Sequence, residues 1–393
     1  MNLAEIQAAL RDSGLDGWLF YDHHHRDPIA YRVLKINPPM CTRRWYYLIP
    51  ASGEPAKLVH RIERGNLEGL PGTVYEYSSW REQHDKLRKI LEGKKRVAME
   101  YSPLNDIPYV GLVDAGTIEL VKGLGVEVVS SGDLVQLFEA RWSDAALASH
   151  LAAGKVVHAA VNAAFAMIRD AVRGGKALGE YEVQQEISRV FEAASVIADE
   201  PAIVAVNRNT ANPHYSPTRA SSLPIRANDF VLLDVWGKLP TPGAVYFDIT
   251  WTGFVGEEVP RRYAEVFSIV REARDAAVRR VTEAQAVGRA LHGYEVDDAA
   301  REVISRHGYG ENFVHRTGHS IGEDVHGNGA NMDNFETRDQ RNIVPRTCFS
   351  VEPGIYLAAF GVRSEVNVYV EAGGARVTGE IQQAIVPILA AAR

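Results

Sequence analysis

The sequence contains little cysteine and no large excess of charge of one sign. Cys41 and Cys348 are the only cysteines among 393 residues, so a disulfide framework is not expected and a reducing cytoplasm is favoured. The 50 acidic residues exceed the 43 basic ones, the formal net charge is -7, and no basic run occurs. Nucleic acid is therefore not an expected partner.

A long apolar run and a secretion signal are also missing. The apolar fraction of 46% is typical of a globular protein. The sequence has no very long uncharged apolar stretch, so a membrane-spanning helix is not expected. The start, Met1–Ile6, has neither the basic segment nor the long apolar segment of a secretory signal. We expect a soluble cytoplasmic protein that does not bind a membrane.

The length of the chain predicts two domains, because one ordinary core rarely serves so many residues. Residues 1–140 alternate helical and strand patterns, beginning with a helix over Leu3–Ser13, and predict an α/β layered domain. Ser143 then has the position of an N-cap for a long alanine-rich helix that stops at Gly174. The second domain is therefore expected at residues 141–393.

Further elements of the second domain follow from periodicity and turn residues. The expected helices cover 181–194, 260–286 and 294–307, and the expected strands cover 203–206, 347–351 and 362–370.

Two β-rich runs, Val231–Trp236 and Val245–Thr252, flank a turn rich in proline and glycine and predict a hairpin. Asp234 interrupts an apolar run that is expected to be buried. A lone buried carboxylate is costly unless something compensates it. A metal ion is one compensator; the alternative is that Asp234 and Asp248 cap turns or pair with arginine.

Four further stretches place polar residues where apolar ones would be expected. They are Asn212–Pro217, His315–His326, Phe349–Tyr356 and Gly361–Asn367. Glu352, like Asp234, ends an apolar strand, and Arg363, Glu365 and Asn367 are expected to share one face of a single strand. Two aspartates, two glutamates and one histidine form a donor set that suits Mn²⁺, Co²⁺ or Zn²⁺.

Charge favours two metal ions if the four carboxylates converge. Two unit charges about 5 Å apart at an effective dielectric constant near 20 repel by roughly 3 kcal/mol. Two divalent ions would neutralise all four carboxylates.

Two other histidine patterns are weaker metal candidates. The consecutive residues His23–His25 have diverging side chains, so a solvated loop is the simpler interpretation. His315 and His319 have the spacing of a helical zinc pair, but Arg316 stands where the general-base glutamate of such a site is needed.

Taken together, these motifs resemble those of the pita-bread metallopeptidases. That family includes Xaa-Pro dipeptidase (prolidase), Xaa-Pro aminopeptidase and methionine aminopeptidase, with metal-free creatinase as a relative. The resemblance covers the whole chain in outline and rests on five ordered motifs. It implies an α/β (α+β) fold, with a creatinase-like N-terminal domain at 1–140 and a pita-bread catalytic domain at 141–393. It also implies a homodimer.

The resemblance assigns roles to individual residues. The implied metal ligands for two divalent ions, most often Mn²⁺ and otherwise Co²⁺ or Zn²⁺, are Asp234, Asp248, His319, Glu352 and Glu365. The implied catalytic groups are Glu352 as proton shuttle, with His214 and His326 contacting substrate and steadying the tetrahedral intermediate. The implied substrate-side residues are His315, Tyr356 and Arg363.

The implied reaction is hydrolysis of Xaa-Pro bonds in dipeptides or short proline-containing peptides. Arg338, Arg341 and Arg363 are candidates for binding the free carboxylate of a dipeptide. Arg338 and Arg341 have offsets from Glu352 that resemble those of prolidases, which favours a dipeptidase. Pairing of Arg338 and Arg341 with Glu336 and Asp339 is the structural alternative. The alternative functions are an Xaa-Pro aminopeptidase, a creatinase-like amidinohydrolase and a non-catalytic binding module.

Three features depart from the family pattern. Asp234 and Asp248 are farther apart in sequence than usual, Trp251 stands where arginine is common, and Val366-Asn367 replaces an acidic pair. These departures affect residues around the expected ligands but remove none of the ligands.

Overall fold

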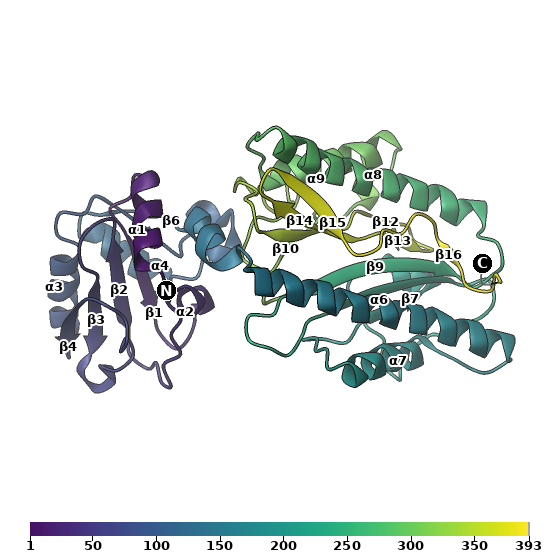
Figure 1. Cartoon of the computed structure of the whole chain (residues 1–393), viewed down its shortest axis with the longest axis horizontal. Helices are drawn as coiled ribbons and strands as arrows, with labels where there is room; N and C mark the ends of the chain where they lie inside the picture. The colour runs from purple at the N-terminus through teal and green to yellow at the C-terminus, as the bar shows by residue number, and fades with distance from the viewer. Residues whose placement is uncertain (392–393) are drawn as a thin grey trace. The chain divides into compact units, whose positions relative to one another are not determined.

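The computed structural model describes residues 1–391. Tertiary contacts divide the chain into two compact units, Met1–Glu139 and Ala140–Arg393. This division lies next to the boundary expected after residue 140. Figure 1 labels the elements of both units.

The N-terminal unit is built on a six-stranded sheet with the order β4-β3-β2-β1-β5-β6. Its strands are β1 (Gly17–Asp22), β2 (Trp45–Pro50), β3 (Ala56–His60), β4 (Thr73–Tyr77), β5 (Arg96–Met99) and β6 (Glu127–Ser130). Only β2 runs against the others. The carboxyl ends of the other five strands therefore lie at one edge of the sheet.

Alternating side chains of this sheet bury both of its faces, as the strand period of two requires. Trp18 and Phe20 pack into one core, whereas Leu19 and Tyr21 pack into the core of the opposite face. The helices of this unit are α1 (Leu3–Asp12), α2 (Pro28–Leu34), α3 (Trp80–Ile90), α4 (Ala115–Gly123) and α5 (Gly132–Val135).

The C-terminal unit begins with the long helix that the sequence predicts. In α6 (Asp144–Arg173), Ser143 caps the first turn by accepting a hydrogen bond from the backbone of Ala146, and Gly174 ends the helix. The other helices are α7 (Glu180–Ala193), α8 (Arg261–Ala286) and α9 (Gly293–Arg306). Figure 1 shows α6 and α7 on one side of the strands and α8 and α9 on the other.

Three groups of strands lie between these helix pairs. One sheet has the order β16-β9-β8-β7, the second β10-β11-β14-β15, and β12 pairs with β13. The bounds are β7 (Ile203–Val206), β8 (Phe230–Gly237), β9 (Phe247–Phe254), β10 (Ser320–Ile321), β11 (Cys348–Val351), β12 (Gly354–Tyr356), β13 (Gly361–Arg363), β14 (Val366–Glu371), β15 (Gly374–Thr378) and β16 (Val386–Pro387). Separate apolar cores fill the space under each helix pair.

The prediction of a single strand over residues 362–370 is wrong. β13 ends at Arg363 and pairs with β12, whereas β14 starts at Val366 and pairs with β11 and β15. The chain changes sheets at Ser364 and Glu365, so Arg363, Glu365 and Asn367 do not share the face of one strand. Arg274 of α8 holds this junction by donating a 2.7 Å hydrogen bond to Ser364 Oγ.

Helix α6 is long and apolar enough, by length and composition, to cross a membrane, although the sequence showed no very long uncharged run. Its apolar face has another partner in the fold. Val157, Val161 and Phe165 are buried in the core that α6 shares with β8 and β9. This packing accounts for the hydropathy of α6 without a membrane.

Candidate metal centre

The β8–β9 hairpin, which the sequence predicts, places two aspartates on one face of the sheet. In the antiparallel register Asp234 lies opposite Thr250, and Trp236 lies opposite Asp248. Residues that face each other across a ladder, and residues two apart along a strand, project to the same side. Asp234, Asp248 and Thr250 therefore project together, and the long turn leaves this register intact.

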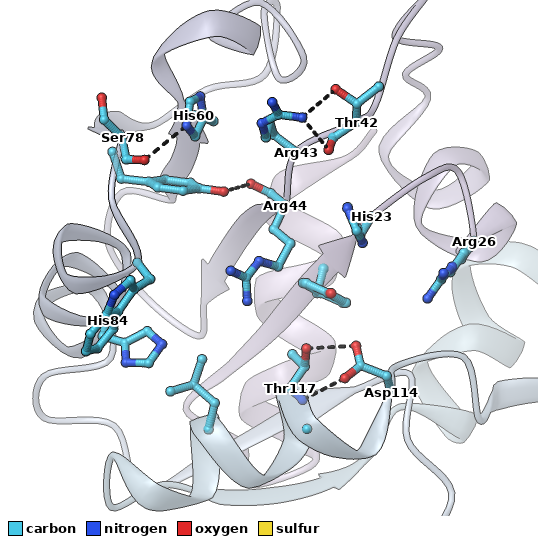
Figure 2. A pocket seen from close by; sticks show the side chains of 15 residues that line it. His23, Arg26, Thr42, Arg43, Arg44, His60, Ser78, His84, Asp114 and Thr117 are labelled. Carbon is cyan, nitrogen blue, oxygen red and sulfur yellow. Dashed lines mark hydrogen bonds between the residues drawn. The ribbon is translucent and has the colours of Figure 1, made fainter.

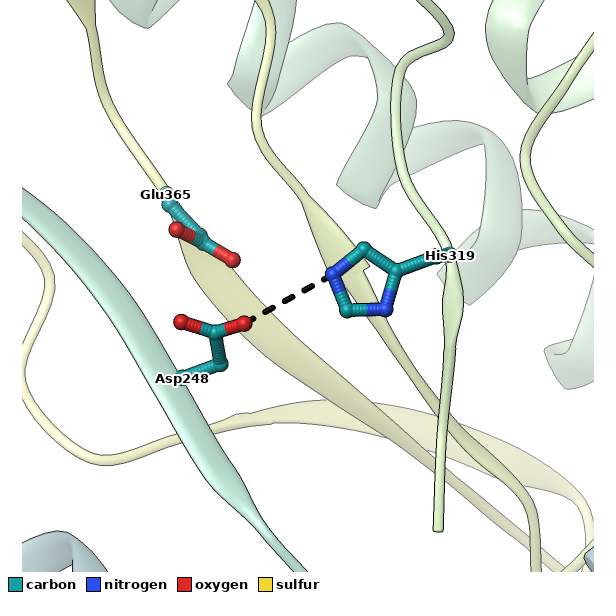
Figure 3. Close-up of side chains that lie close together, drawn as sticks. All are labelled: Asp248, His319 and Glu365. Atoms are coloured by element: carbon teal, nitrogen blue, oxygen red, sulfur yellow. Dashed lines mark ion pairs between the residues drawn. The ribbon is translucent and has the colours of Figure 1, made fainter. Parts of the chain in front are cut away.

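Three other elements bring acidic and imidazole groups to this face. His319 precedes β10, Glu352 follows β11, and Glu365 lies at the junction of β13 and β14. One ligand atom each of Asp248, His319 and Glu365 lies within 4.8 Å of the others (Figure 3). The Nε2 atom of His319 is 3.6 Å from Asp248 Oδ2 and 3.4 Å from Glu352 Oε1.

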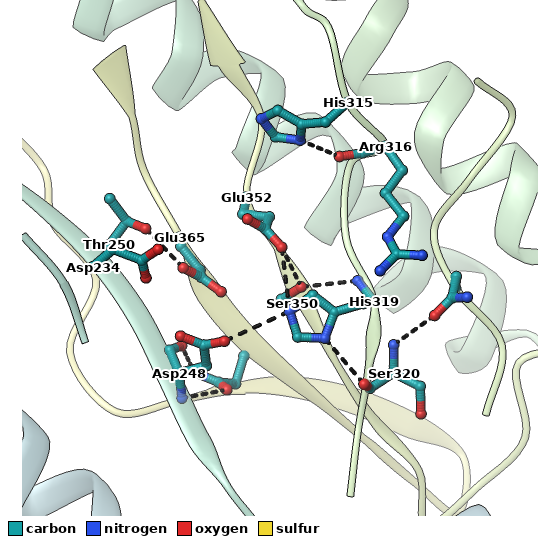
Figure 4. A network of polar contacts seen from close by, with 12 residues as sticks. Asp234, Asp248, Thr250, His315, Arg316, His319, Ser320, Ser350, Glu352 and Glu365 are labelled. Atoms are coloured by element: carbon teal, nitrogen blue, oxygen red, sulfur yellow. Dashed lines mark hydrogen bonds and ion pairs between the residues drawn. The ribbon is translucent and has the colours of Figure 1, made fainter. Parts of the chain in front are cut away.

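Arg363 links Asp234 to this group. Its Nη2 donates to Asp234 Oδ2, its Nε donates to Thr250 Oγ1 over 2.8 Å, and the same Nε lies 3.8 Å from Glu352 Oε2. Figure 4 shows the resulting cluster of four carboxylates and one imidazole. We call Asp234, Asp248, His319, Glu352 and Glu365 the metal-site residues. The alternative that Asp234 pairs with an arginine is therefore also present, because Asp234 binds Arg363 and lies with the other metal-site residues at the same time.

The metal-site residues fit a pair of divalent ions. Asp248 Oδ1 and Glu365 Oε1 are buried and have no hydrogen-bond partner among residues 1–391. Burial raises the pKa values of Asp248 and Glu365, and it raises the pKa of Asp234 to about 7 despite the opposing charge of Arg363. Buried carboxylate oxygens without donors need cations. Carboxylate oxygens with one imidazole are a donor set for divalent transition metals.

Glu352 has a different electrostatic environment from the other three acids. Burial favours its neutral form, but the positive charges of His319 and Arg363 outweigh burial and lower the pKa of Glu352. Its side chain is also partly exposed. Glu352 is therefore the acid of the cluster that ionises most readily. Exposure does not distinguish it, because its side chain is 16% exposed and that of Asp234 is 13% exposed.

Ser350 and Asn367 support the ligands. Ser350 Oγ donates to Glu352 Oε1 and accepts from the backbone N–H of His319, both over 2.9 Å. Asn367 accepts from the Asp248 backbone N–H over 3.2 Å and donates to the Asp248 carbonyl over 2.6 Å. Strand alternation could have indicated Ser350, which stands two residues before Glu352. Asn367 was noted in the sequence as a neighbour of Arg363 and Glu365 and as a departure from the family pattern, but its bonds to Asp248 were not predicted.

Three predicted substrate-side residues form a connected chain beside the cluster. His315 Nε2 lies 2.7 Å from the hydroxyl of Tyr356, and Arg363 Nη1 donates to that hydroxyl over 3.3 Å. Burial lowers the pKa of His315 to about 4, so its imidazole is neutral at pH 7. The ring of His326 lies 4.3 Å from that of His319, and the charge of His319 is the main reason that the pKa of His326 falls to about 3.

The structure does not join two other predicted residues to the cluster. His214 is exposed on a loop, where its backbone N–H donates to Asn212 Oδ1. The guanidinium of Arg338 lies 4.6 Å from the centre of the Tyr294 ring. No contact within residues 1–391 connects either side chain with a metal-site residue.

The alternative pairing of Arg341 with Asp339 is present, but it is buried and not on the surface. Arg341 Nη2 lies 2.6 Å from Asp339 Oδ2. Trp251 projects from the opposite face of β9 and meets His158 of α6, with ring centres 5.9 Å apart. The arginine-to-tryptophan departure therefore does not change the metal-binding face.

Comparison with known proteins identifies the family. The profile of metallopeptidase family M24 matches residues 148–372. The chain belongs to metallopeptidase family M24. Within residues 148–372 lie all five metal-site residues of this M24 member.

The chain is similar to Xaa-Pro dipeptidase from Lactobacillus helveticus, with 32% identity over 214 residues, which are 54% of this chain and 52% of that protein. The chain thus matches about half the length of this relative. Probable dipeptidase PepE from Mycobacterium bovis is 27% identical over 379 residues, covering 95% of this chain and 92% of that protein.

Solved structures of similar fold cover nearly the whole M24 chain. The crystal structure of dipeptidase PepE from Mycobacterium ulcerans has a TM-score of 0.70 and 25% identity, covering 98% of this chain and 96% of that chain. The expected fold, a creatinase-like α/β unit followed by a pita-bread unit, is confirmed.

Proposed function

We propose that this M24 member is a dinuclear metal-dependent peptidase that hydrolyses Xaa-Pro bonds, most readily in dipeptides. The observation that carries the proposal is the convergence of four carboxylates and one imidazole, with buried oxygens of Asp248 and Glu365 that have no donor among residues 1–391. The similarity to Xaa-Pro dipeptidase and to dipeptidase PepE supports this substrate class.

The five metal-site residues would hold two divalent ions, with Mn²⁺ favoured by the oxygen-rich donor set and Co²⁺ or Zn²⁺ accepted by the same donors. Such ions lower the pKa of water and polarise a carbonyl group. Ser350 and Asn367 would keep the ligands in place, as outer hydrogen bonds do in other metal sites.

Glu352 is the proposed proton shuttle. Because its pKa is lowered, the carboxylate is ionised at neutral pH and can accept a proton from the attacking water. The same carboxyl group then delivers that proton to the leaving proline nitrogen. Ser350, which donates to Oε1, leaves Oε2 for this transfer.

Imidazole N–H groups would steady the negative charge that develops on the carbonyl oxygen. His326, next to His319, and His214, on its exposed loop, are the proposed hydrogen-bond donors. His315 and Tyr356 would line the proline side of the site, where their 2.7 Å contact fixes the phenol ring.

Arg316 is a better candidate than Arg338 for binding the carboxylate of a dipeptide. Its positive charge acts on both His319 and His326, and Figure 4 shows its side chain beside His319. A guanidinium pairs with a carboxylate through two parallel hydrogen bonds. The sequence gave no indication of this role for Arg316, which was noted only because it stands where a helical zinc site would need a glutamate.

The test is a peptide panel with the Mn²⁺-loaded full chain. We expect hydrolysis of Ala-Pro and Leu-Pro, weaker hydrolysis of Ala-Pro-Ala and none of Ala-Ala. Asp248→Asn should abolish hydrolysis, whereas Asp170→Asn, at an exposed acid on α6, should not. Faster cleavage of Ala-Pro-Ala than of Ala-Pro would assign an aminopeptidase instead, and full turnover by Asp248→Asn would contradict the proposed site.

The same panel tests the carboxylate-binding residue. Arg316→Gln should raise KM for Ala-Pro more than for Ala-Pro-Ala, because only the dipeptide places its carboxylate next to proline at the reacting bond. Arg338→Gln is the matched comparison and should change neither value. If Arg338→Gln and not Arg316→Gln raised KM for Ala-Pro, the carboxylate would be assigned to Arg338, as the sequence predicted.

We also propose a cytoplasmic homodimer. Two buried free cysteines suit a reducing compartment, and the family resemblance implies the dimer. Mass measurement of the native protein at micromolar concentration would test the dimer directly, since a monomer would contradict it.

A further inference from the structure

A second site of distinct chemistry lies within the N-terminal unit. A cavity of about 870 Å³ opens where β1, β3 and β4 end, and Tyr21, His60 and Tyr77 from these strands line it. In α/β sheets, ligands bind outside the carboxyl ends of the strands. None of the metal-site residues lines this cavity, so its occupant does not depend on the proposed peptidase activity.

Basic side chains dominate the walls of the cavity. Those that line it are Arg26, Arg43, Arg44, His23, His60 and His84. The one acidic residue among the lining residues is Asp114, which caps α4 by accepting hydrogen bonds from the backbone and hydroxyl of Thr117 at 2.9 and 2.8 Å. The lining residues therefore include three guanidinium groups and a single carboxylate, and that carboxylate is already engaged in capping α4.

Two of the arginines that line the cavity are of particular interest. Within residues 1–391, neither Arg26 nor Arg44 forms an ion pair, and Figure 2 shows Arg44 extending into the middle of the cavity. Arg43 Nη1 donates to the carbonyl and hydroxyl of Thr42, each over 3.1 Å. Like charges held close together without a partner repel each other, and an anion between them would remove this cost.

The charges of Arg26 and Arg44 affect the pKa values of other residues that line the cavity. Burial, His24, Arg26 and Arg44 together lower the pKa of His23. The charge of Arg44 also opposes the effect of burial on Tyr77, whose pKa rises to about 12. The lowered pKa makes His23 neutral at pH 7, whereas the guanidinium groups stay charged.

Two helices also begin at the cavity. The first turn of α3 contributes Trp80, and that of α4 contributes Gly116 and Thr117. The amino ends of helices carry partial positive charge and favour anions. Both helix starts are already capped by carboxylates, Glu82 in α3 and Asp114 in α4. The attraction for an anion therefore comes mainly from the guanidinium groups.

We propose that this cavity binds a small molecule carrying a doubly charged oxyanion, held by Arg44 and Arg26. A phosphate group and a dicarboxylate share the chemistry that guanidinium groups recognise, which is paired acceptor oxygens with negative charge. The volume accommodates a metabolite-sized ligand and not only an inorganic ion.

The experiment is calorimetric titration of the full chain at constant ionic strength, with inorganic phosphate and with succinate as probes. We expect saturable binding of at least one probe. Arg44→Gln should weaken that binding by roughly tenfold and Arg26→Gln by about threefold, since each removes a charged donor. Tighter binding of phosphate would identify a phosphate ester as the class, and tighter binding of succinate would identify a dicarboxylate.

Arg96→Gln is the matched control. Arg96 starts β5 at the opposite edge of the sheet and pairs with Glu127 over 3.2 Å, so its loss should leave probe binding unchanged. Binding that persists in Arg44→Gln and Arg26→Gln but disappears with a chelator would place the probe at the metal centre and overturn the proposal. Absence of binding, together with a changed native mass in Arg44→Gln, would show instead that an acidic group of a second copy fills the cavity.

Discussion

Asn367 illustrates how a single side chain can fix the position of a metal ligand. It is fully buried, and it bonds both the N–H and the C=O of Asp248, whose Oδ1 has no donor in the described part of the chain. The amide thus holds the backbone of Asp248 while leaving the carboxylate available. A carboxylate at position 367 could accept but not donate in this arrangement, and it would add another negative charge to the cluster.

Asn367→Ala should lower metal affinity by roughly tenfold or more, because hydrogen bonds behind a ligand commonly contribute that much. Competition with a chromogenic chelator measures this affinity. Asn66→Ala, at a buried asparagine of the N-terminal unit, should leave metal affinity unchanged. Equal affinities for Asn367→Ala and the wild type would show that Asp248 does not need this support.

The five residues that converge in the structure were all named from the sequence. Asp234 and Glu352 were visible as interruptions of apolar runs, whereas His319 was named through the family resemblance. Their role as metal ligands stays a prediction.

The sequence did not reveal the roles of Asn367, Ser350 or Arg316. Their partners lie on other strands or loops, so their roles depend on tertiary register. Arg338 was selected by its offset from Glu352, and offset alone does not determine where a loop side chain points.

At the scale of elements, the packing of α6 against β9 positions the hairpin that carries both aspartates. Gly154 of α6 faces Phe247 of β9, which precedes Asp248. A Cβ at position 154 would lie 2.6 Å from the Phe247 ring. Close approach of this helix therefore requires glycine.

Gly154→Ala sets helix propensity against packing. Alanine favours a helix by up to about 1 kcal/mol over glycine, whereas overpacking of a core costs about 1–3 kcal/mol. We expect packing to dominate and Tm to fall, as differential scanning calorimetry can show. Gly123→Ala in α4, where nothing lies within 4 Å of the added Cβ, should raise Tm or leave it unchanged. A higher Tm for Gly154→Ala would contradict the close packing.

Strong periodicity and clear caps made most elements predictable, including α6 with its Ser143 cap and the β8–β9 hairpin. β4 and α4 were not predicted from the sequence. β4 has exposed and half-buried residues along most of its length, so it lacks the apolar pattern of a central strand. The break at Ser364 and Glu365 was missed because Val362–Val370 has strand character throughout, and only the pairing with β12 or β11 separates its halves.

At the scale of the whole molecule, the two units bury acids in different ways. In the C-terminal unit four carboxylates meet around a candidate metal pair. In the N-terminal unit Asp27 and Glu100 are buried near each other, and Trp18 Nε1 donates to Glu100 Oε1 over 2.8 Å. Burial raises the pKa of Glu100 to about 7, and burial with the charge of Glu100 raises the pKa of Asp27. This pair retains a proton where the other cluster requires metal.

This retained proton predicts a pH dependence of stability. Because the folded pKa of Glu100 lies above the usual 4.5, the stabilisation is complete below about pH 4.5 and disappears as pH rises through about 7. The free energy of unfolding should fall by roughly 3 kcal/mol over this window. Urea denaturation from pH 4.5 to 8 measures it. Glu100→Gln should make the profile shallower without flattening it, because burial also raises the pKa values of Asp27, Asp234, Asp248 and Glu365. Glu119→Gln on α4 should leave the profile unchanged. Parallel profiles for Glu100→Gln and the wild type would exclude the retained proton.

Metal stoichiometry tests the central claim most directly, since the proposed chemistry depends on two ions held by side chains from separate strands. Elemental mass spectrometry of the full chain, saturated with Mn²⁺ and then desalted, should give two divalent ions per chain, with at most one in Glu365→Gln. Fewer than one ion per wild-type chain, or an unchanged count in Glu365→Gln, would contradict the account.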